Sequence, residues 1–251
     1  MSNASGRLVF TLLAILALAC ASVAGASEPA ESSAQATLRI VIVGGTGTIG
    51  QRIVREALER GHHLTLVARD PATVTEKHER LAVIQGNVLD ASGVAALAKG
   101  KDVLISATGV ARDRDPDYSF YRRAAESLVA AMRSLGSDAP RLLVVGGVGS
   151  LQRTDGTPVI DNVPADRKPE HLGQKAALDY YRGVADVKWT YLSPPGRIAP
   201  GERTGKYRLG KDQLVVDDQG ESRISMEDYA VAMIDEAENP RHVGQRFTVG
   251  Y

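Results

Sequence analysis

From Leu38 onward, short apolar runs alternate with longer stretches in which apolar residues recur every three or four positions. The short runs are rich in valine, isoleucine and leucine, which is typical of buried strands, whereas the longer stretches are typical of helices that cover a sheet. Strands are expected at 38–43, 64–67, 81–85, 102–106, 141–145 and 188–192, and helices at 49–60, 91–98, 118–135 and 170–183. This alternation predicts an α/β fold with a mainly parallel sheet covered on both faces.

The pattern changes after the sixth strand. The run Ser193-Pro194-Pro195-Gly196 interrupts the chain, and a stretch rich in glycine and basic residues follows. A short strand is expected at 214–216, a helix at 225–238 and a last strand at 246–249. Ser225 and Asp228 have the spacing of a helix-capping box. We therefore expect a small C-terminal lobe after Ser193 that lines a substrate cleft.

A glycine-rich segment, Val41-Ile42-Val43-Gly44-Gly45-Thr46-Gly47-Thr48-Ile49-Gly50, joins the first strand to the first helix. Its glycines match G-x-G-x-x-G, a pattern that permits a tight turn and close approach of the backbone to a pyrophosphate. Free N–H groups at the start of the helix then face the phosphates. The segment predicts a doubly wound Rossmann sheet whose cofactor contacts include Gly44, Thr46, Gly47, Thr48, Ile49 and Gly50.

The end of the second strand indicates which dinucleotide is bound. A site for NAD has an acid there that bonds the ribose 2′-hydroxyl, whereas an arginine accommodates a 2′-phosphate. This chain has Arg69 followed by Asp70 and Pro71. We expect Arg69 to contact the 2′-phosphate of NADP(H) and Asp70 to begin the next helical turn.

Composition and charge exclude several other functions. The 251 residues include 30 basic and 30 acidic side chains, so the net charge is zero and no positive surface for nucleic acid is expected. Cys20 is the only cysteine. A chain cleaved after it has no disulfide and no thiolate metal site, and we predict no metal.

The N-terminal segment resembles an export signal. Residues 8–24 form a nearly unbroken apolar run, Arg7 precedes it, and Ala24-Gly25-Ala26 fits a cleavage site. We predict a signal peptide at 1–26, a linker at 27–37 and one NAD(P)-binding domain at 38–251, in a periplasmic or membrane-associated protein. Three alternatives stay open: an uncleaved membrane anchor, lipid attachment at Cys20, and a mis-assigned start that leaves the protein in the cytoplasm.

Together, these residues resemble the atypical short-chain dehydrogenase/reductase group, which includes NAD(P)H-binding, NmrA-like and biliverdin-reductase-B-like proteins. The resemblance covers roughly residues 38–251 and includes Gly86-Asn87-Val88-Leu89-Asp90 and Ser106-Ala107-Thr108-Gly109. It implies that Asn87 and Val88 lie beside the adenine and that Ala107, Thr108 and Gly109 lie along the ribose. Many relatives have aspartate at the position of Asn87, and an amide can also bond the adenine amino group.

The catalytic part of the resemblance is incomplete. Many relatives carry Y-x-x-x-K, whereas this chain has His171-Leu172-Gly173-Gln174-Lys175. The resemblance implies that Lys175 holds the ribose, that His171 replaces the tyrosine as proton donor, and that Ser150 bonds a substrate carbonyl. A histidine can donate a proton near neutral pH, and a spacing of four residues places both side chains on one helical face.

The sequence favours an NADPH-dependent reductase of a small carbonyl, quinone or flavin-like acceptor. Two alternatives are kept: a non-catalytic NADP(H) sensor of the NmrA-like kind, and an enzyme similar to sugar-nucleotide epimerases. We expect a small-molecule substrate, no nucleic acid partner and, through the N-terminal segment, a possible attachment to the membrane.

Overall fold

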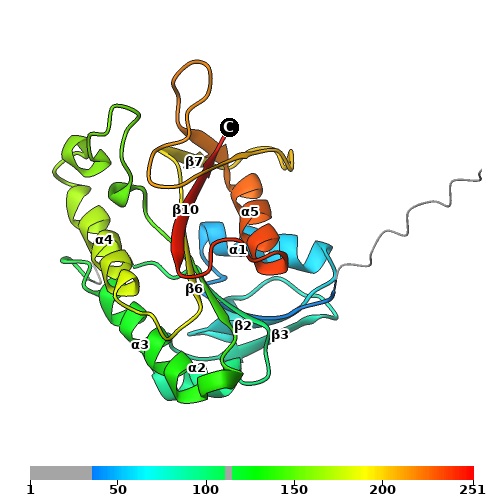
Figure 1. Cartoon of the computed structure of the whole chain (residues 1–251). Helices are drawn as coiled ribbons and strands as arrows, with labels where there is room; N and C mark the ends of the chain where they lie inside the picture. Colours follow the sequence, from blue (N-terminus) through cyan, green and yellow to red (C-terminus); the bar gives the residue numbers. More distant parts are fainter. Residues whose placement is uncertain (1–35, 111–114) are drawn as a thin grey trace, which may run out of the picture. The chain divides into compact units, whose positions relative to one another are not determined.

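An eight-stranded sheet forms the centre of the part of the chain that the computed structural model describes, residues 36–110 and 115–251 (Figure 1). Its strand order is β3-β2-β1-β4-β5-β6-β10-β8, and neighbouring strands are parallel except for β10 and β8. The strands are β1 (Arg39–Val43), β2 (His63–Ala68), β3 (Leu81–Gln85), β4 (Val103–Ser106), β5 (Arg141–Val145), β6 (Trp189–Ser193), β8 (Arg208–Gly210) and β10 (Gln245–Gly250). The expected mainly parallel Rossmann sheet is confirmed.

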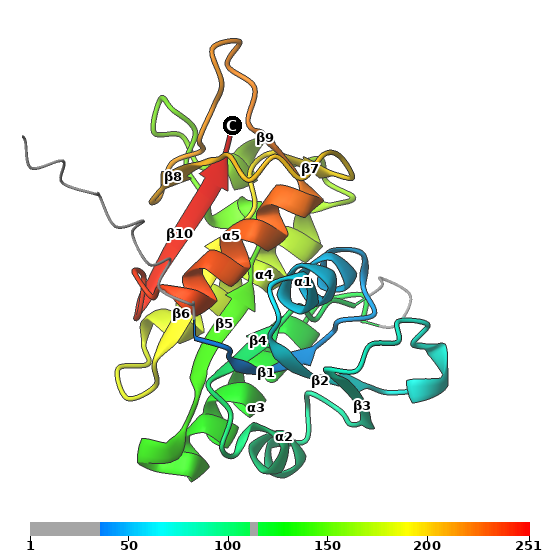
Figure 2. The same cartoon turned by 90° about the vertical axis from the view of Figure 1, so that its right-hand side faces the viewer.

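Helices cover both faces of this sheet (Figures 1 and 2). On one face lie α2 (Ala91–Ala98), α3 (Phe120–Leu135) and α4 (Lys168–Arg182), and on the other lie α1 (Thr48–Glu59) and α5 (Met226–Glu238). Short 3-10 turns occur at η1 (Pro71–Thr73), η2 (Gly136–Asp138), η3 (Val148–Ser150) and η4 (Val159–Asn162). Each face of the sheet therefore has its own apolar core.

The first strand shows why its sequence is continuously apolar. Ile40 and Ile42 pack in the core beneath α1 and α5, whereas Val41 and Val43 pack in the core beneath α2, α3 and α4. Side chains alternate between the two faces of a strand, so a strand covered on both faces needs apolar residues at every position.

The strand order places the ligand site. The chain builds outward from β1 through β2 to β3, then returns to the other side of β1 and builds outward through β4, β5 and β6. In such sheets, ligands bind outside the carboxyl ends of the strands where the order reverses. The site is therefore expected above the ends of β1 and β4.

The segment after Ser193 is divided between the main sheet and a small addition to it. Strands β7 (Arg197–Ala199) and β9 (Arg223–Ser225) form a separate parallel pair, whereas β8, α5 and β10 complete the main fold (Figure 2). The separate lobe expected from Ser193 to the C-terminus is thus smaller than the sequence indicated.

Helix α5 fixes the loop that connects β7 to β8. Ser225 caps the helix by accepting a hydrogen bond from the Asp228 backbone N–H, as the capping box predicted. The buried Asp228 carboxylate accepts hydrogen bonds from Thr204 Oγ1 (2.6 Å), the Gly205 N–H (2.8 Å) and the Tyr251 hydroxyl (2.7 Å). These three hydrogen bonds satisfy a buried polar group, and they hold both the loop and the C-terminus against α5.

The strand expected at 214–216 was a wrong prediction, because the structure places β8 at Arg208–Gly210 instead. Val215 is buried, but it packs against Gly210 and Gly250, where a Cβ added to either glycine would lie 2.7–3.0 Å from its side chain. Val215 is therefore buried because it packs on two glycines, and not because it belongs to a strand.

The predicted signal peptide and most of the predicted linker lie outside the described residues. In 36–110 and 115–251, no helix has both the length and the apolar character needed to cross a bilayer.

Candidate functional site

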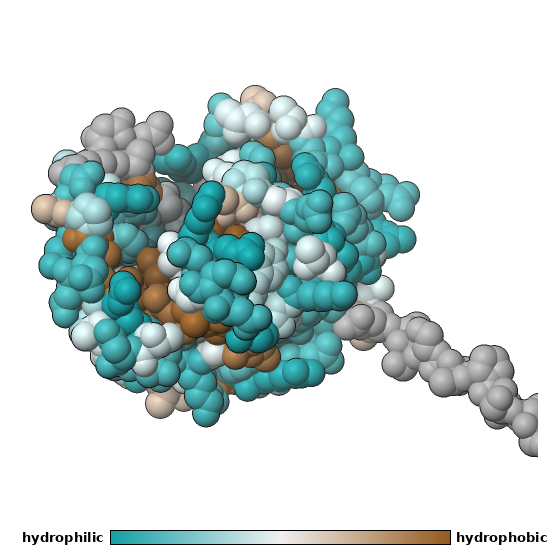
Figure 3. Space-filling view, turned by 90° about the horizontal axis from the view of Figure 1, so that it is seen from above, coloured by the Kyte–Doolittle hydropathy of each residue, from teal (hydrophilic) through white to brown (hydrophobic). Residues whose placement is uncertain are grey.

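A cavity of about 1100 Å³ runs along the carboxyl ends of β1, β2, β4, β5 and β6. Seen from the side on which the parallel strands end, the surface there shows apolar residues in a hollow between hydrophilic side chains (Figure 3). Most of the predicted cofactor contacts line this cavity: Gly44, Thr46, Gly47, Thr48, Ile49, Arg69, Asn87, Val88, Ala107, Thr108 and Gly109. The structure thus brings together residues from four separate loops.

At two positions of the glycine segment, neighbouring backbone atoms leave no room for a side chain. Gly44 has φ +80°, and a Cβ there would lie 2.5 Å from the backbone oxygen of Ala107. A Cβ on Gly50 would lie 2.2 Å from the Gly44 oxygen, so Gly50 serves the packing of α1 and does not line the cavity. Gly47 differs, because its Cβ would meet only the Gly44 oxygen, at 3.3 Å, and its surface faces the cavity.

The N-terminus of α1 leaves its first N–H groups without a side-chain cap. Asp90 caps α2 through the Gly93 N–H and Ser225 caps α5, whereas the N-cap residues of α3 and α4, like that of α1, make no such bond. The first turn of a helix has N–H groups with no partner inside the helix, and they carry the positive end of its dipole. Because Thr48 and Ile49 of this turn line the cavity, the arrangement fits the pyrophosphate of a dinucleotide.

The end of β2 presents a cation to the cavity. Arg69 lines it, whereas Asp70 accepts a hydrogen bond from the Ala72 N–H (3.0 Å) and caps η1. Asp70 thus begins the next helical turn, as the sequence predicted. The arrangement leaves a guanidinium at the place where a Rossmann site reads the ribose.

The loops that follow β3 and β4 complete the part of the cavity predicted to hold the cofactor. Asn87 Oδ1 accepts a hydrogen bond from the Leu89 N–H (3.0 Å), which fixes the Asn87 side chain at the cavity wall. The Thr108 hydroxyl lies 3.0 Å from the Ser106 hydroxyl. Both loops therefore have local bonds that hold their shape around the cavity.

His171 lines the cavity from the first turns of α4. Its Nδ1 is buried and has no hydrogen-bond partner among the described residues, and its ring packs against η3, where a Cβ on Gly149 would lie 2.7 Å from the His171 Cβ. Burial lowers the pKa of His171, the charge of Arg167 lowers it further, and the charge of Glu170 opposes both. The imidazole is therefore neutral at pH 7.

The structure does not bring Lys175 or Ser150 to the cavity surface. The Lys175 ammonium pairs with Asp179 at 2.6 Å, one turn further along α4, and the side chain is 41% exposed. Ser150 Oγ donates to the Gly147 oxygen (3.4 Å) and accepts from Arg246 Nη1 (3.2 Å). In this structure Lys175 therefore points along its own helix, and Ser150, the last residue of η3, is bonded to Gly147 and Arg246, so their expected roles stay predictions.

Gln174 and Tyr121 line the cavity instead, and the sequence did not single them out. Gln174 reaches the turn after β5, where a Cβ on Gly147 would lie 2.0 Å from the amide oxygen. Tyr121, on α3, donates its hydroxyl to Glu170 Oε1 (3.3 Å) and accepts from Gln174 Nε2 (3.4 Å). Burial and the charge of Glu170 raise the pKa of Tyr121 to about 12.

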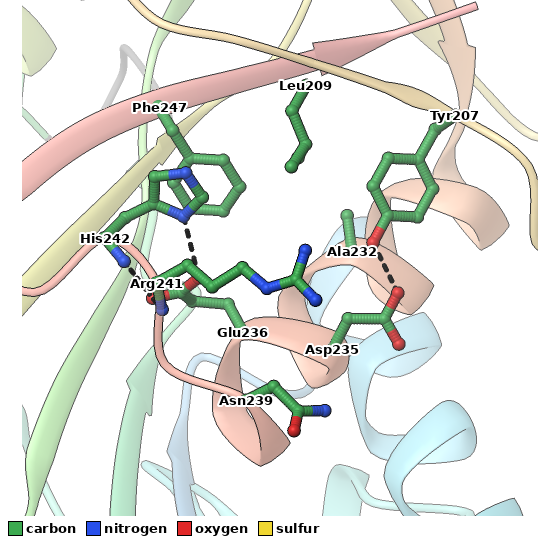
Figure 4. Close-up of a pocket in the computed structure, with 9 residues that line it drawn as sticks. All are labelled: Tyr207, Leu209, Ala232, Asp235, Glu236, Asn239, Arg241, His242 and Phe247. Carbon is green, nitrogen blue, oxygen red and sulfur yellow. Dashed lines mark hydrogen bonds and ion pairs between the residues drawn. The ribbon is translucent and has the colours of Figure 1, made fainter.

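A second, much smaller cavity of about 120 Å³ lies between the end of α5 and strands β8 and β10 (Figure 4). Two of the polar groups that line it are already paired: the Tyr207 hydroxyl with Asp235, and His242 Nδ1 with Glu236 at 2.8 Å. The His242 ring stacks on Phe247 at 4.0 Å. This cavity is too small for a dinucleotide and is separate from the glycine segment.

Comparison with known proteins agrees with this geometry. A family model described as NAD(P)H-binding matches residues 44–239. Among solved structures, a Burkholderia pseudomallei protein provisionally named as exported is 38% identical, with a TM-score of 0.76, over 86% of this chain and 100% of its own. A Bacteroides thetaiotaomicron protein provisionally named as an epimerase is 36% identical, with a TM-score of 0.77, over 86% and 98%.

A third solved structure is a Streptococcus pneumoniae protein provisionally named as an NADH-flavin reductase. It is 28% identical, with a TM-score of 0.74, over 85% of this chain and 99% of its own. The glycine segment, the uncapped start of α1 and the family match agree on one ligand class. The chain belongs to the NAD(P)H-binding family, and its cofactor is a nicotinamide dinucleotide.

Proposed function

We propose that this protein is an NADPH-dependent reductase whose acceptor is a flavin or a quinone. The observation that supports this most is that one cavity joins the dinucleotide-binding loops to a further compartment whose described lining residues include Tyr121 but no lysine to pair with it. When bound, the cofactor supplies a hydride, and the protein positions the two reactants and excludes water.

The preference for NADPH over NADH rests on Arg69. Arg69 lines the cavity at the end of β2, and the neighbouring acid, Asp70, caps η1 and does not line the cavity. A planar guanidinium matches the oxygens of a phosphate with two charge-assisted hydrogen bonds. An NAD site would instead present the carboxylate to the ribose.

The proton donors near the cavity support the choice of acceptor. Reduction of a carbonyl leaves an alkoxide that needs a proton, and a general acid works best when its pKa lies near the working pH. His171 has a lowered pKa and is neutral at pH 7, whereas the pKa of Tyr121 is raised to about 12. Lys175, which would lower the pKa of a neighbouring tyrosine, is paired with Asp179.

A flavin or a quinone does not have this requirement, because its reduced form takes protons from solvent. The walls of the compartment suit a planar ring, since they include the side chains of Val148, Val159, Val163, Pro195 and Ile198. The streptococcal relative provisionally named as an NADH-flavin reductase is consistent with this acceptor class.

An epimerase activity is the second candidate, because one solved relative at 36% identity carries that provisional name. Epimerisation through a transient ketone needs an acid–base group that removes and returns a hydroxyl proton. The same two pKa shifts and the position of Lys175 argue against it. A non-catalytic NADP(H) sensor is the remaining alternative and would bind the cofactor without turnover.

Export of the protein is also part of the proposal. One relative is provisionally named as exported, and the N-terminal sequence fits a signal peptide. An exported reductase has to acquire its nicotinamide cofactor before it leaves the cytoplasm or from a supply outside it.

The proposal is tested by measuring NADPH oxidation with a panel of flavins, quinones and small aldehydes under anaerobic conditions. We expect turnover with flavins or quinones, little with aldehydes, and a lower KM for NADPH than for NADH. NADPH binding without oxidation by any acceptor would favour the sensor, and preferential reduction of aldehydes would contradict the proposed acceptor class.

A further inference from the structure

Three arginines line the cavity at the end away from Arg69: Arg153, Arg167 and Arg197. Each comes from a different segment, since Arg153 follows η3, Arg167 immediately precedes α4, and Arg197 begins β7. All three are exposed, so they lie at the cavity mouth and not in its interior. Three separate segments thus contribute positive charge to the same compartment.

The carboxylates that line this cavity do not form ion pairs with these arginines, although Asp155, which does not line it, interacts with the charge of Arg153. Within 36–110 and 115–251, the carboxylates that line the cavity are Asp115 and Glu170. Asp115 accepts the Phe120 N–H at the start of α3, at 2.5 Å, and lies 3.6 Å from Arg123, whereas Glu170 accepts the hydroxyl of Tyr121. No ion pair between described residues involves the guanidinium groups of the three arginines.

The backbone holds at least two of these arginines in place. The Arg197 N–H donates to the Ser222 oxygen at 2.8 Å, within the β7–β9 pair. The Arg153 N–H donates to the Thr157 oxygen at 2.8 Å, across a tight turn. The Arg167 backbone oxygen accepts the His171 N–H at 3.5 Å, so Arg167 lies one turn before a residue on the cavity wall.

The phosphates of the cofactor lie too far from Arg197 to account for its charge, whereas Arg153 and Arg167 belong to the crossover that follows β5. Four strand intervals separate β2, where Arg69 lies, from β6, which leads into Arg197. At about 4.8 Å per interval, the distance is about 19 Å. The N-terminus of α1, which faces the pyrophosphate, is three intervals from β6, or about 14 Å.

We infer that the acceptor carries an anionic group, a phosphate monoester or a carboxylate, attached to its planar ring. This inference rests on the proposed reductase function and narrows its substrate class. Arginine binds both anions with two parallel hydrogen bonds, and cations at a cavity mouth also attract an anionic substrate from solution. The apolar walls hold the ring, and the arginines hold the anionic end.

FMN and riboflavin form a matched pair for the test, because they share one ring system and differ by a phosphate. The first measurement is the ratio of kcat/KM for FMN to that for riboflavin, with saturating NADPH at low salt. Two or three exposed charge contacts correspond to a ratio of about ten, and the ratio should fall as salt screens them. In the double variant Arg167→Ala/Arg197→Ala, the ratio should approach one.

The matched control is Arg55→Ala, since Arg55 is also exposed but lies on α1 away from the cavity. It removes the same charge and should leave the ratio unchanged. A second measurement is independent of turnover: quenching of flavin fluorescence on binding to the full chain loaded with NADP⁺. FMN should bind about ten times more tightly than riboflavin, and this difference should disappear in the double variant.

The outcomes separate the two proposals. Equal affinity and equal turnover for both flavins would overturn the anionic acceptor and leave the reductase function standing. Failure of both flavins to bind would also overturn the anionic acceptor. Arginine-dependent binding of FMN without NADPH oxidation would support the anion-binding site and overturn the reductase function.

Discussion

Gly47→Val separates the cofactor site from the stability of the fold. Gly47 has φ −75° and ψ 167°, an extended conformation that valine adopts readily, and its Cβ would meet only the Gly44 oxygen, at 3.3 Å. As the N-cap of α1 it has no side chain to lose, so we expect the free energy of unfolding to fall by about 1 kcal/mol at most.

The effect on binding should be much larger. Gly47 lines the cavity beside the first N–H groups of α1, where the pyrophosphate would lie, so a valine side chain occupies space that the phosphates need. We expect NADPH affinity to fall at least ~100-fold, which corresponds to about 2.7 kcal/mol. Isothermal titration calorimetry measures the affinity, and thermal unfolding measures the stability.

Gly44→Ala is the matched control, because it lies in the same turn but should reduce the stability of the fold more than Gly47→Val does. Gly44 has φ +80°, and its Cβ would lie 2.5 Å from the Ala107 backbone oxygen. A positive φ alone costs an alanine about 1–2 kcal/mol, and the clash adds to this cost. We therefore expect a clear fall in the free energy of unfolding. A folded Gly47→Val variant that binds NADPH as well as the wild type would refute the placement of the pyrophosphate.

Five further predictions concern single residues, the pH dependence and the N-terminus. Arg69→Ala should weaken NADPH binding about tenfold, or about 1.4 kcal/mol, and leave NADH binding nearly unchanged in calorimetry; equal losses would mean that Arg69 does not contact the 2′-phosphate. His171→Phe should change kcat with a flavin by less than about threefold, whereas loss of a general acid costs about 100-fold or more. Because burial lowers the pKa of His171, most of its titration lies below pH 7. The pH profile of kcat should therefore be flat from pH 7 upward over the histidine range, and a decline there would indicate a protonated His171. Lys175→Met should leave the KM for NADPH within about twofold in steady-state kinetics, since the ammonium pairs with Asp179; a rise beyond about tenfold would restore its predicted ribose contact. N-terminal sequencing of the native protein should find cleavage after Ala26, and an intact N-terminus in the membrane fraction would indicate an anchor.

The parts of the fold that could be predicted depend on local rules. All but one of the expected strands and all of the expected helices occur near their predicted bounds, because buried strands and amphipathic helices have distinct periods. The caps at Asp70 and Ser225 were also predictable, since each depends on a side chain and an N–H two or three residues away. The glycine segment lies where its strand–turn–helix context placed it.

The parts that were not predicted depend on contacts between distant segments. Strands β7 and β9 are three residues each, and their pairing gives no periodic signal. A spacing of four residues places Lys175 on the same side of α4 as His171, but its long side chain turns to Asp179. Tyr121 reaches the cavity because α3 packs beside α4, a contact that its own sequence does not reveal.

The most direct test of reductase function is a single-turnover reaction. The full chain loaded with NADPH is mixed rapidly with excess FMN under anaerobic conditions, and the reaction is repeated with NADPH deuterated at the transferred position. The proposed function requires oxidation of the bound NADPH at a rate at least equal to kcat, with a slower rate for the deuterated cofactor. NADPH that stays bound and unoxidised by FMN and by quinones would contradict it.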